Sequence, residues 1–208
     1  AGPNAMDAPL HYAPVAILES LTINRGIASV SSGQETIGGF VEAQTYAGEY
    51  GFSGDFEFSG RTYFGAQSIN SGTVASGFFA LANRNHILRS FVMQEKADDL
   101  EIPDGEITPS EYDRERYDLG YSYRNGDHEF SLDFARNNTK DAGTASLPMD
   151  IAAIDSDLFR SRYTWEGNDR NFTAEFSASD NEHLMTNYHL RRPPQDNMMT
   201  AGAMRYRR

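Results

Sequence analysis

Cysteine is absent from this chain of 208 residues. A disulfide framework and a cysteine-ligated zinc site are therefore both excluded. No run of apolar residues approaches the roughly 18 that a membrane-spanning helix needs, and the mean hydropathy is −0.58. The apolar residues are instead scattered and often aromatic, with 13 phenylalanines and 11 tyrosines but a single tryptophan.

Positive charge is also scarce, because 18 lysines and arginines stand against 30 aspartates and glutamates. The resulting net charge of −12 argues against nucleic acid or an anionic membrane surface as a partner. It favours cations or basic groups.

The signatures of common enzymes are missing as well. The sequence contains no Gly-x-Ser-x-Gly elbow, no phosphate-binding glycine loop and no His-Glu-x-x-His, the motifs that place a nucleophile, a phosphate or a catalytic zinc. Carboxylates are plentiful, but no pair stands out as an acid and a base. We expect a protein that is not an enzyme and requires no cofactor.

What the chain does contain is alternation with a period of two, from residue 55 onward. Between residues 55 and 64, phenylalanine, glycine and threonine occupy one set of alternate positions, and charged or polar residues mostly occupy the other. Residues 116–124, 130–134 and 172–178 repeat this scheme. The pattern predicts antiparallel strands with one apolar and one polar face.

The predicted connections alternate in length. Short turns are expected at residues 83–85, 125–127 and 166–170, and longer polar segments at 67–73, 97–113, 137–156 and 180–197. Asn125-Gly126 is a strong hairpin signal, because both residues tolerate positive φ. Tight turns at one end and long loops at the other are typical of outer-membrane barrels.

The predicted fold is therefore all-β, an antiparallel transmembrane β-barrel. About eight strands are expected, against roughly 22 in plugged outer-membrane transporters, so the barrel is partial. The polar face suits a water-filled lumen and the aromatic face suits lipid. An interfacial girdle near the short turns is predicted from Trp165, Tyr121, Tyr123, Phe130 and Phe172. The alternative is a soluble β-sandwich, whose strands also alternate.

Residues 21–45 differ from the rest, with two apolar runs interrupted by glycines. They predict a strand, a glycine turn and a second strand that ends at Thr45, preceded by a short helical turn within residues 15–20. Glycine inside a strand pattern marks a bend or a close backbone approach. Such a segment suits a small unit packed inside something larger.

This segment resembles the end of the plug domain of TonB-dependent outer-membrane receptors. The matching residues are Gly26, Ser29, Gly33, Gly38, Gly39, Val41 and Thr45, whereas Ile27 and Ser32 replace the usual proline and tyrosine. The resemblance implies that residues 1–50 are the C-terminal part of a plug and residues 51–208 the first barrel strands. It implies the outer membrane of a Gram-negative cell, with membrane lipid, the TonB complex and a transported substrate as partners. We therefore expect a piece of a longer protein.

Metal ligation is the one chemistry that the residues indicate. His183 and Met185 are two apart, so on an extended backbone they point to the same side. Thioethers favour Cu(I), and imidazole accepts several transition metals. Met6 and His11 lie just before the plug-like segment. A methionine is more often a gap filler in a core, so both interpretations stay open.

A narrower resemblance favours copper. Residues 6–9 and 183–191 are similar to the copper-receptor branch of that family, which implies copper ligands at Met6, His183 and Met185. The cysteine of that branch would fall on Gly2, and His11 is the candidate to replace it. The expected function is energised uptake of a copper-like metal ion or a metal chelate, with copper as substrate. The alternatives are a receptor for a siderophore or other nutrient, and a non-transporting soluble sandwich or adhesin module.

Acidic residues crowd the predicted long connection between residues 97 and 115. They are Asp98, Asp99, Glu101, Asp104, Glu106, Glu111, Asp113 and Glu115. Such a run is usually a solvated surface, and the alternative is that it attracts cations or binds Ca²⁺.

Overall fold

The computed structural model describes residues 14–27, 38–192 and 202–207. The chain forms two compact units, Ala1–Ala47 and Gly48–Arg208, which are treated separately below. Within the described ranges, no helix has the length and apolar character needed to cross a membrane.

The first unit is built around one antiparallel hairpin. A short 3-10 helix, η2 (Val15–Ile17), precedes β1 (Leu18–Arg25), which pairs with β2 (Gly39–Thr45). At Gly39, φ is +102°, and an added Cβ would lie 2.0 Å from the Asn24 carbonyl oxygen, so only glycine fits there. The two strands and the helical turn predicted for this segment are confirmed.

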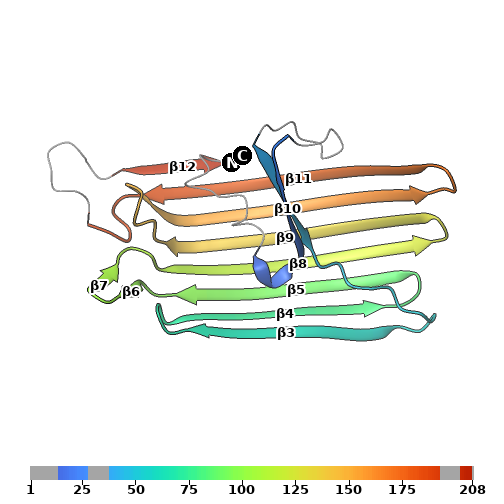
Figure 1. The fold of residues 1–208 in the computed structure, drawn as a ribbon, viewed down its shortest axis with the longest axis horizontal. Coiled ribbons are helices and arrows are strands. Elements are labelled where there is room, and N and C mark those ends of the chain that lie inside the picture. The colour runs from blue at the N-terminus through green and yellow to red at the C-terminus, as the bar shows by residue number, and fades with distance from the viewer. Residues whose placement is uncertain (1–13, 28–37, 193–201, 208) are drawn as a thin grey trace. The chain divides into compact units, whose positions relative to one another are not determined.

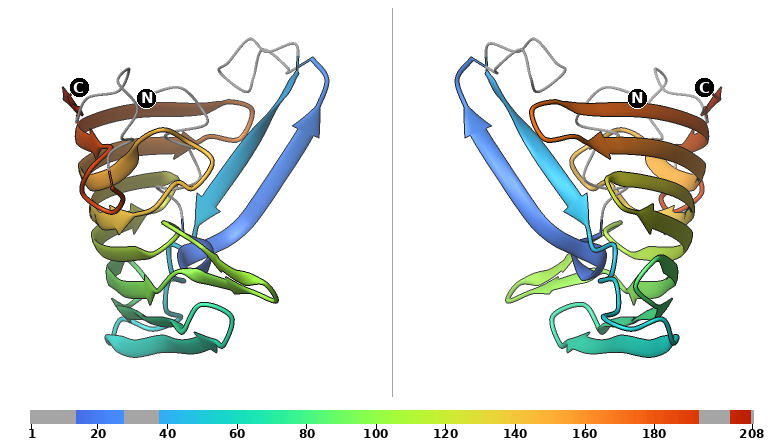
Figure 2. Two further views of the ribbon diagram at one scale, coloured as in Figure 1. Left: turned by 90° about the vertical axis from the view of Figure 1, so that its left-hand side faces the viewer. Right: turned by 90° about the vertical axis from the view of Figure 1, so that its right-hand side faces the viewer.

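The second unit is one antiparallel sheet of eight strands in the order β12-β11-β10-β9-β8-β5-β4-β3 (Figure 1). Its strands are β3 (Glu57–Gln67), β4 (Gly72–Ala82), β5 (His86–Ala97), β8 (Tyr112–Asn125), β9 (His128–Ala142), β10 (Asp150–Glu166), β11 (Asn171–Thr186) and β12 (Ala203–Arg207). A small hairpin of β6 (Leu100–Ile102) and β7 (Gly105–Ile107) projects from it (Figure 2). Because the eight strands form a single sheet, the two-sheet sandwich alternative is wrong.

The turns are sorted by length as predicted, with one exception. Residues 83–85, 126–127 and 167–170 make the short connections at one end of the sheet (Figure 1). The connection predicted to be long at residues 67–73 is instead a turn of residues 68–71. Asn70 tightens it, because its Oδ1 accepts the Gly72 N–H at 3.2 Å.

The strands also run further into the predicted loops than expected. β9 continues to Ala142, β10 begins at Asp150, and β11 continues to Thr186. The sequence predicts loops there because the alternation breaks down: residues 137–141 are polar on both faces, and residues 150–154 do not alternate.

The two faces of the sheet differ sharply. The face that carries Leu119, Phe134 and Phe159, which are cross-strand neighbours, exposes its apolar side chains; it is called the apolar face below. The opposite face, called the polar face, carries Arg116 and Asn137, which are cross-strand neighbours and buried. This arrangement is the reverse of a soluble sheet, which buries its apolar side.

Candidate functional site

The polar face buries two arginines in ion pairs, beside apolar side chains such as Ile87 and Phe91. Arg89 pairs with Asp133, and its Nη1 donates to Ser122 Oγ at 2.8 Å. An added Cβ on Gly120 would lie 2.5 Å from Arg89 Nε, so the guanidinium passes directly over this glycine. The missing side chain therefore makes room for the ion pair.

A second buried arginine lies on the same face. Arg116 Nε donates to Asp118 Oδ2 at 3.0 Å, and its Nη1 donates to Asn137 Oδ1 at 3.0 Å. A charge taken out of water is tolerated when it is paired and hydrogen-bonded. Both arginines meet this condition, so a charged face is compatible with the fold.

The apolar part of the polar face is covered by the chain that leads into β3. An added Cβ on Gly48 would lie 3.5 Å from Phe78 Cζ and 3.6 Å from Ile87 Cγ2. The Gly51 N–H donates to the Asn83 carbonyl oxygen at 3.0 Å. Residues 48–55 are thus fixed to the turn between β4 and β5.

Tyr50 in this segment reaches across to β8. The Arg124 Cζ atom lies 4.0 Å from the centre of the Tyr50 ring, within the range of a cation–π contact. Burial, followed by the negative charge of Glu129, raises the pKa of Tyr50 to about 12. The phenol therefore stays neutral at physiological pH.

His183 and Met185 lie in β11, on the polar face. They are 9 % and 1 % exposed, which places both side chains away from solvent. Met185 has two cross-strand partners, Ile151 on β10 and Met204 on β12. The prediction that the pair lies in an outer loop is wrong, because β11 extends to Thr186.

Met204 is a potential ligand whose place could not be read from the sequence. Directly opposed residues of neighbouring strands have Cβ atoms roughly 4.5–5.5 Å apart, so the thioethers of Met185 and Met204 start from adjacent positions. The predicted ligands Met6 and His11 lie outside the described residues.

Other histidines in the described part of the chain are engaged elsewhere. On the apolar face, His86 Nδ1 lies 2.8 Å from Tyr121 Oη, and His128 Nδ1 lies 2.7 Å from Tyr163 Oη. His189 Nε2 lies 2.6 Å from an Asp141 carboxylate oxygen. Among the residues that the structure describes, no three His, Cys, Asp or Glu side chains are placed to hold a metal ion.

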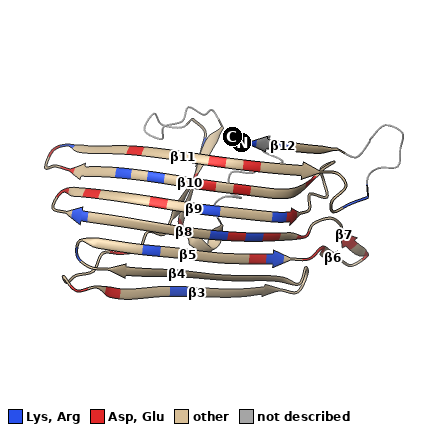
Figure 3. Cartoon of the chain, turned by 180° about the vertical axis from the view of Figure 1, so that it is seen from behind, with Lys and Arg blue, Asp and Glu red and all other residues tan. Residues whose placement is uncertain are grey.

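The acidic connection folds into the β6–β7 hairpin, whose charges are visible in Figure 3. Asp99 Oδ1 accepts the backbone N–H groups of Ser110 at 2.6 Å and Glu111 at 3.1 Å. Burial raises the pKa of Asp99, but these hydrogen bonds outweigh it and hold the pKa below its ordinary value. Burial, then the charge of Asp99, raises the pKa of Glu111. One member of the run is thus a structural cap, and the Ca²⁺ alternative gains no support.

No family model matches the sequence, and no curated protein matches it. Twenty-seven chains of solved structures do match the fold. One is the copper transporter OprC, with a TM-score of 0.86 and 21 % identity, over 96 % of this chain and 31 % of that chain. The chain thus spans about a third of that protein's length. At this identity the likeness establishes the fold, and the predicted all-β partial barrel is confirmed.

Proposed function

We propose that this chain belongs to a TonB-dependent outer-membrane receptor that takes up a metal ion, of the copper kind, or a metal chelate. The observation that carries the proposal is the inverted sheet, with aromatic side chains exposed on one face and paired charges buried on the other. Lipid against the apolar face would explain the exposed aromatic side chains, and a water-filled lumen would explain the paired charges on the polar face. Likeness of fold to a copper transporter supports transport.

The first unit supplies the plug in this proposal. Residues 1–50 carry the glycine pattern of the end of a plug, and the strands β1 and β2 end at Arg25 and Thr45, as that pattern predicts. The TonB complex of the inner membrane would act on the plug. Rearrangement of the plug would then open a path along the polar face.

The substrate would be held by soft ligands on β11 and β12. His183 offers an imidazole, and Met185 and Met204 offer neighbouring thioethers, a set that suits Cu(I). Met6 and His11 are the candidate ligands from the first unit. Release follows if a ligand on one side moves away, since fewer donors hold a metal less tightly.

The lipid contact is tested with the single tryptophan. Trp165 lies on the apolar face at the short-turn end, paired across strands with His128 and Phe172. We expect lipids brominated near the headgroup to quench its fluorescence more strongly than lipids brominated near the chain ends. Absence of quenching by either lipid would contradict the membrane assignment.

The substrate is tested by competition for Cu(I) with a chromophoric chelator, on the protein purified in detergent. We expect the double variant His183→Ala with Met185→Ala to bind Cu(I) at least tenfold more weakly, the order of loss typical for altered metal sites. His189→Ala is the matched control, because that imidazole is engaged with Asp141. Equal binding by wild type and double variant would reject the copper site and favour a siderophore or other nutrient receptor.

A further inference from the structure

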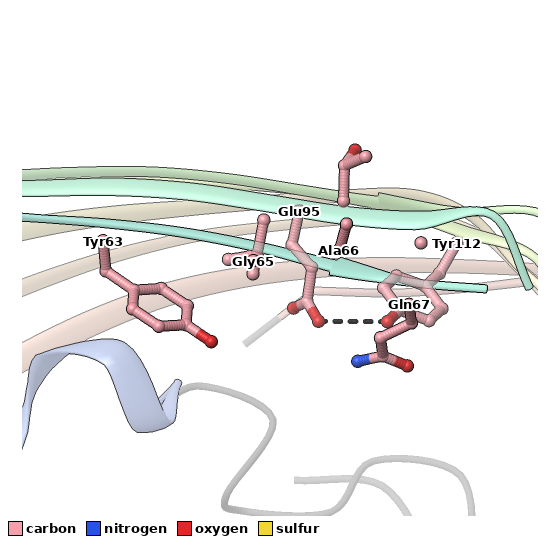
Figure 4. A pocket seen from close by; sticks show the side chains of 9 residues that line it. Tyr63, Gly65, Ala66, Gln67, Glu95 and Tyr112 are labelled. Carbon is pink, nitrogen blue, oxygen red and sulfur yellow. Dashed lines mark hydrogen bonds between the residues drawn. The ribbon is translucent and has the colours of Figure 1, made fainter. Parts of the chain in front are cut away.

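A pocket of about 80 Å³ opens between β3, β4, β5 and β8, near the end of the sheet that carries the long connections (Figure 4). Its principal lining residues are Tyr63, Gly65, Gln67, Gly72, Glu95 and Tyr112. About 10–15 Å³ of such space suffices for one water molecule, so the pocket has room for a group of several atoms.

The pocket belongs to the polar face but is separate from the proposed copper ligands. Gly65, Val74, Glu95 and Arg114 are successive cross-strand partners. The same row continues to His183 on β11, which lies four strands from Glu95. At about 4.8 Å between neighbouring strands, that separation is roughly 19 Å.

Two glycines keep the pocket open. An added Cβ on Gly65 would lie 2.8 Å from Tyr63 Oη and 2.9 Å from Val74 Cγ1. An added Cβ on Gly72 would lie 2.7 Å from Asn70 Oδ1. Any side chain at residue 65 would therefore occupy the space that the pocket provides.

The main hydrogen-bond acceptor in the pocket is the Glu95 carboxylate. The Tyr112 hydroxyl donates to Glu95 Oε1 at 3.0 Å. Arg114 forms an ion pair with Glu95, but its Nη1 lies 3.8 Å from Glu95 Oε2, which is too long for a hydrogen bond. A carboxylate has about four acceptor positions, so Glu95 retains capacity for a ligand.

A further acceptor reaches the same space. Figure 4 shows the side chains of Tyr63, Gln67 and Glu95 on one side of the strands, with the Tyr63 hydroxyl directed toward the carboxylate and the oxygen of the Gln67 amide directed away from it. The Tyr63 phenol can accept one hydrogen bond from a ligand. Arg114 also lies over the Tyr112 ring, with its Cζ 4.6 Å from the ring centre.

We propose that this pocket binds a primary alkylammonium group. Such a group carries N–H donors and one positive charge, which match the Glu95 carboxylate and the Tyr63 phenol oxygen. Aromatic rings attract organic cations, and the net charge of −12 attracts cations to the protein as a whole. The site would recognise the amine of a small organic molecule or of an incoming substrate. It depends on neither the copper ligands nor metal transport.

The test is a saturation-transfer NMR titration of the detergent-purified protein with ethylammonium chloride, with ethanol as the uncharged probe of the same length. We expect saturable ethylammonium binding in the millimolar range and no saturable binding of ethanol. Glu95→Gln keeps an acceptor for the Tyr112 hydroxyl, so it is expected to fold. It should bind ethylammonium on the order of tenfold more weakly, because the charge-assisted hydrogen bond is lost.

A matched control is present on the opposite face. There the Tyr117 hydroxyl donates to Glu115 Oε2 at 3.3 Å, a Tyr–Glu pair outside the pocket. Glu115→Gln should leave ethylammonium binding unchanged, whereas Gly65→Ala should abolish it by filling the pocket. The proposal is overturned if wild type shows no saturation, if ethanol binds as well as ethylammonium, or if Glu95→Gln binds like wild type.

Discussion

Strands β8 and β9 allow the two faces of the sheet to be compared at adjacent residues. On the apolar face, the cross-strand partners Leu119 and Phe134 are 56 % and 44 % exposed. On the polar face, the cross-strand partners Arg116 and Asn137 are 6 % and 7 % exposed. A protein in water places such residues the other way round. The comparison teaches that the alternation of this sequence exposes its apolar side chains, as the proposed membrane location requires.

The apolar region of this face ends at a row of polar and charged residues. Tyr117, Arg136, Asp157 and Asp180 are successive cross-strand partners on that face, and Arg136 Nε donates to Asp157 Oδ1 at 2.6 Å. From Trp165 to Asp157, β10 covers about 27 Å at roughly 3.4 Å per residue. This length, before strand tilt is considered, is similar to the roughly 25 Å apolar band of outer-membrane barrels.

The largest effect is expected from a charge placed within that band. Phe176 is exposed on the apolar face of β11, and Phe176→Lys should destabilise the protein in phospholipid vesicles by about 2–4 kcal/mol, the cost of lysine near the middle of a bilayer. The measurement is urea-induced unfolding in vesicles, followed by the fluorescence of Trp165.

Ser179→Lys is the control for this prediction. Ser179 is exposed on the polar face of the same strand, opposite Leu158, and an exposed polar position normally tolerates substitution within about 0.5 kcal/mol. If the two lysines cost the same, the difference between the faces does not reflect lipid and the proposed membrane location fails.

A smaller effect is expected where the polar face is tightly packed. Gly120→Ala would place a Cβ 2.5 Å from Arg89 Nε and 2.7 Å from Asp133 Oδ1, so the buried ion pair must move. Overpacking of this kind costs about 1–3 kcal/mol. The free energy of unfolding of the variant, measured in urea, checks the prediction.

Gly54→Ala provides the comparison for that variant. An added Cβ on Gly54 meets no atom within 4 Å, and we expect its unfolding free energy to stay within about 0.5 kcal/mol of wild type. Equal losses at both glycines would show that the Arg89–Asp133 pair does not depend on the space above Gly120.

The sequence predicted the faces better than it predicted the strand ends. Aromatic, aliphatic and small residues at alternate positions of β3, β8 and β11 defined the apolar face, and Asn125-Gly126 located a turn correctly. The end of β9 and the start of β10 fall in the predicted loop 137–156, because past the row of Arg136 the alternation is lost: β9 is polar on both faces, and β10 runs Asp-Ile-Ala-Ala-Ile. Alternation of hydropathy therefore predicts strands only where one face is mainly apolar and the other mainly polar.

The candidate sites were also only partly predictable from the sequence. Period two placed His183 and Met185 on one side of an extended chain, and this holds on β11. The Met204 partner follows only from the pairing of β11 with β12. The Glu95–Tyr112 contact joins residues 17 apart across β5 and β8, and no local motif links them. The only sign of this pocket in the sequence is the pair of glycines at residues 65 and 72.

The smallest effect is expected at the end of the sheet that carries the long connections. Burial, then the charges of Asp99 and Asp141, raises the pKa of Glu111. The folded state therefore favours the protonated carboxyl, and that stabilisation is complete below the ordinary glutamate pKa and is lost as pH rises through the raised value. Glu111→Gln should remove the penalty at neutral pH and change little in acid.

The Gly143 N–H reports this effect locally, because it donates to the Glu111 carbonyl oxygen at 2.8 Å. After correction for intrinsic exchange rates, hydrogen exchange at Gly143 should be slower in Glu111→Gln than in wild type at pH 7, and equal in the two proteins near pH 4. Exchange that is slower in the variant at both pH values would mean that the substitution acts through packing. Exchange that is faster at pH 7 would mean that the ionised carboxylate stabilises this connection, so that charge would be favourable there as it is on the polar face.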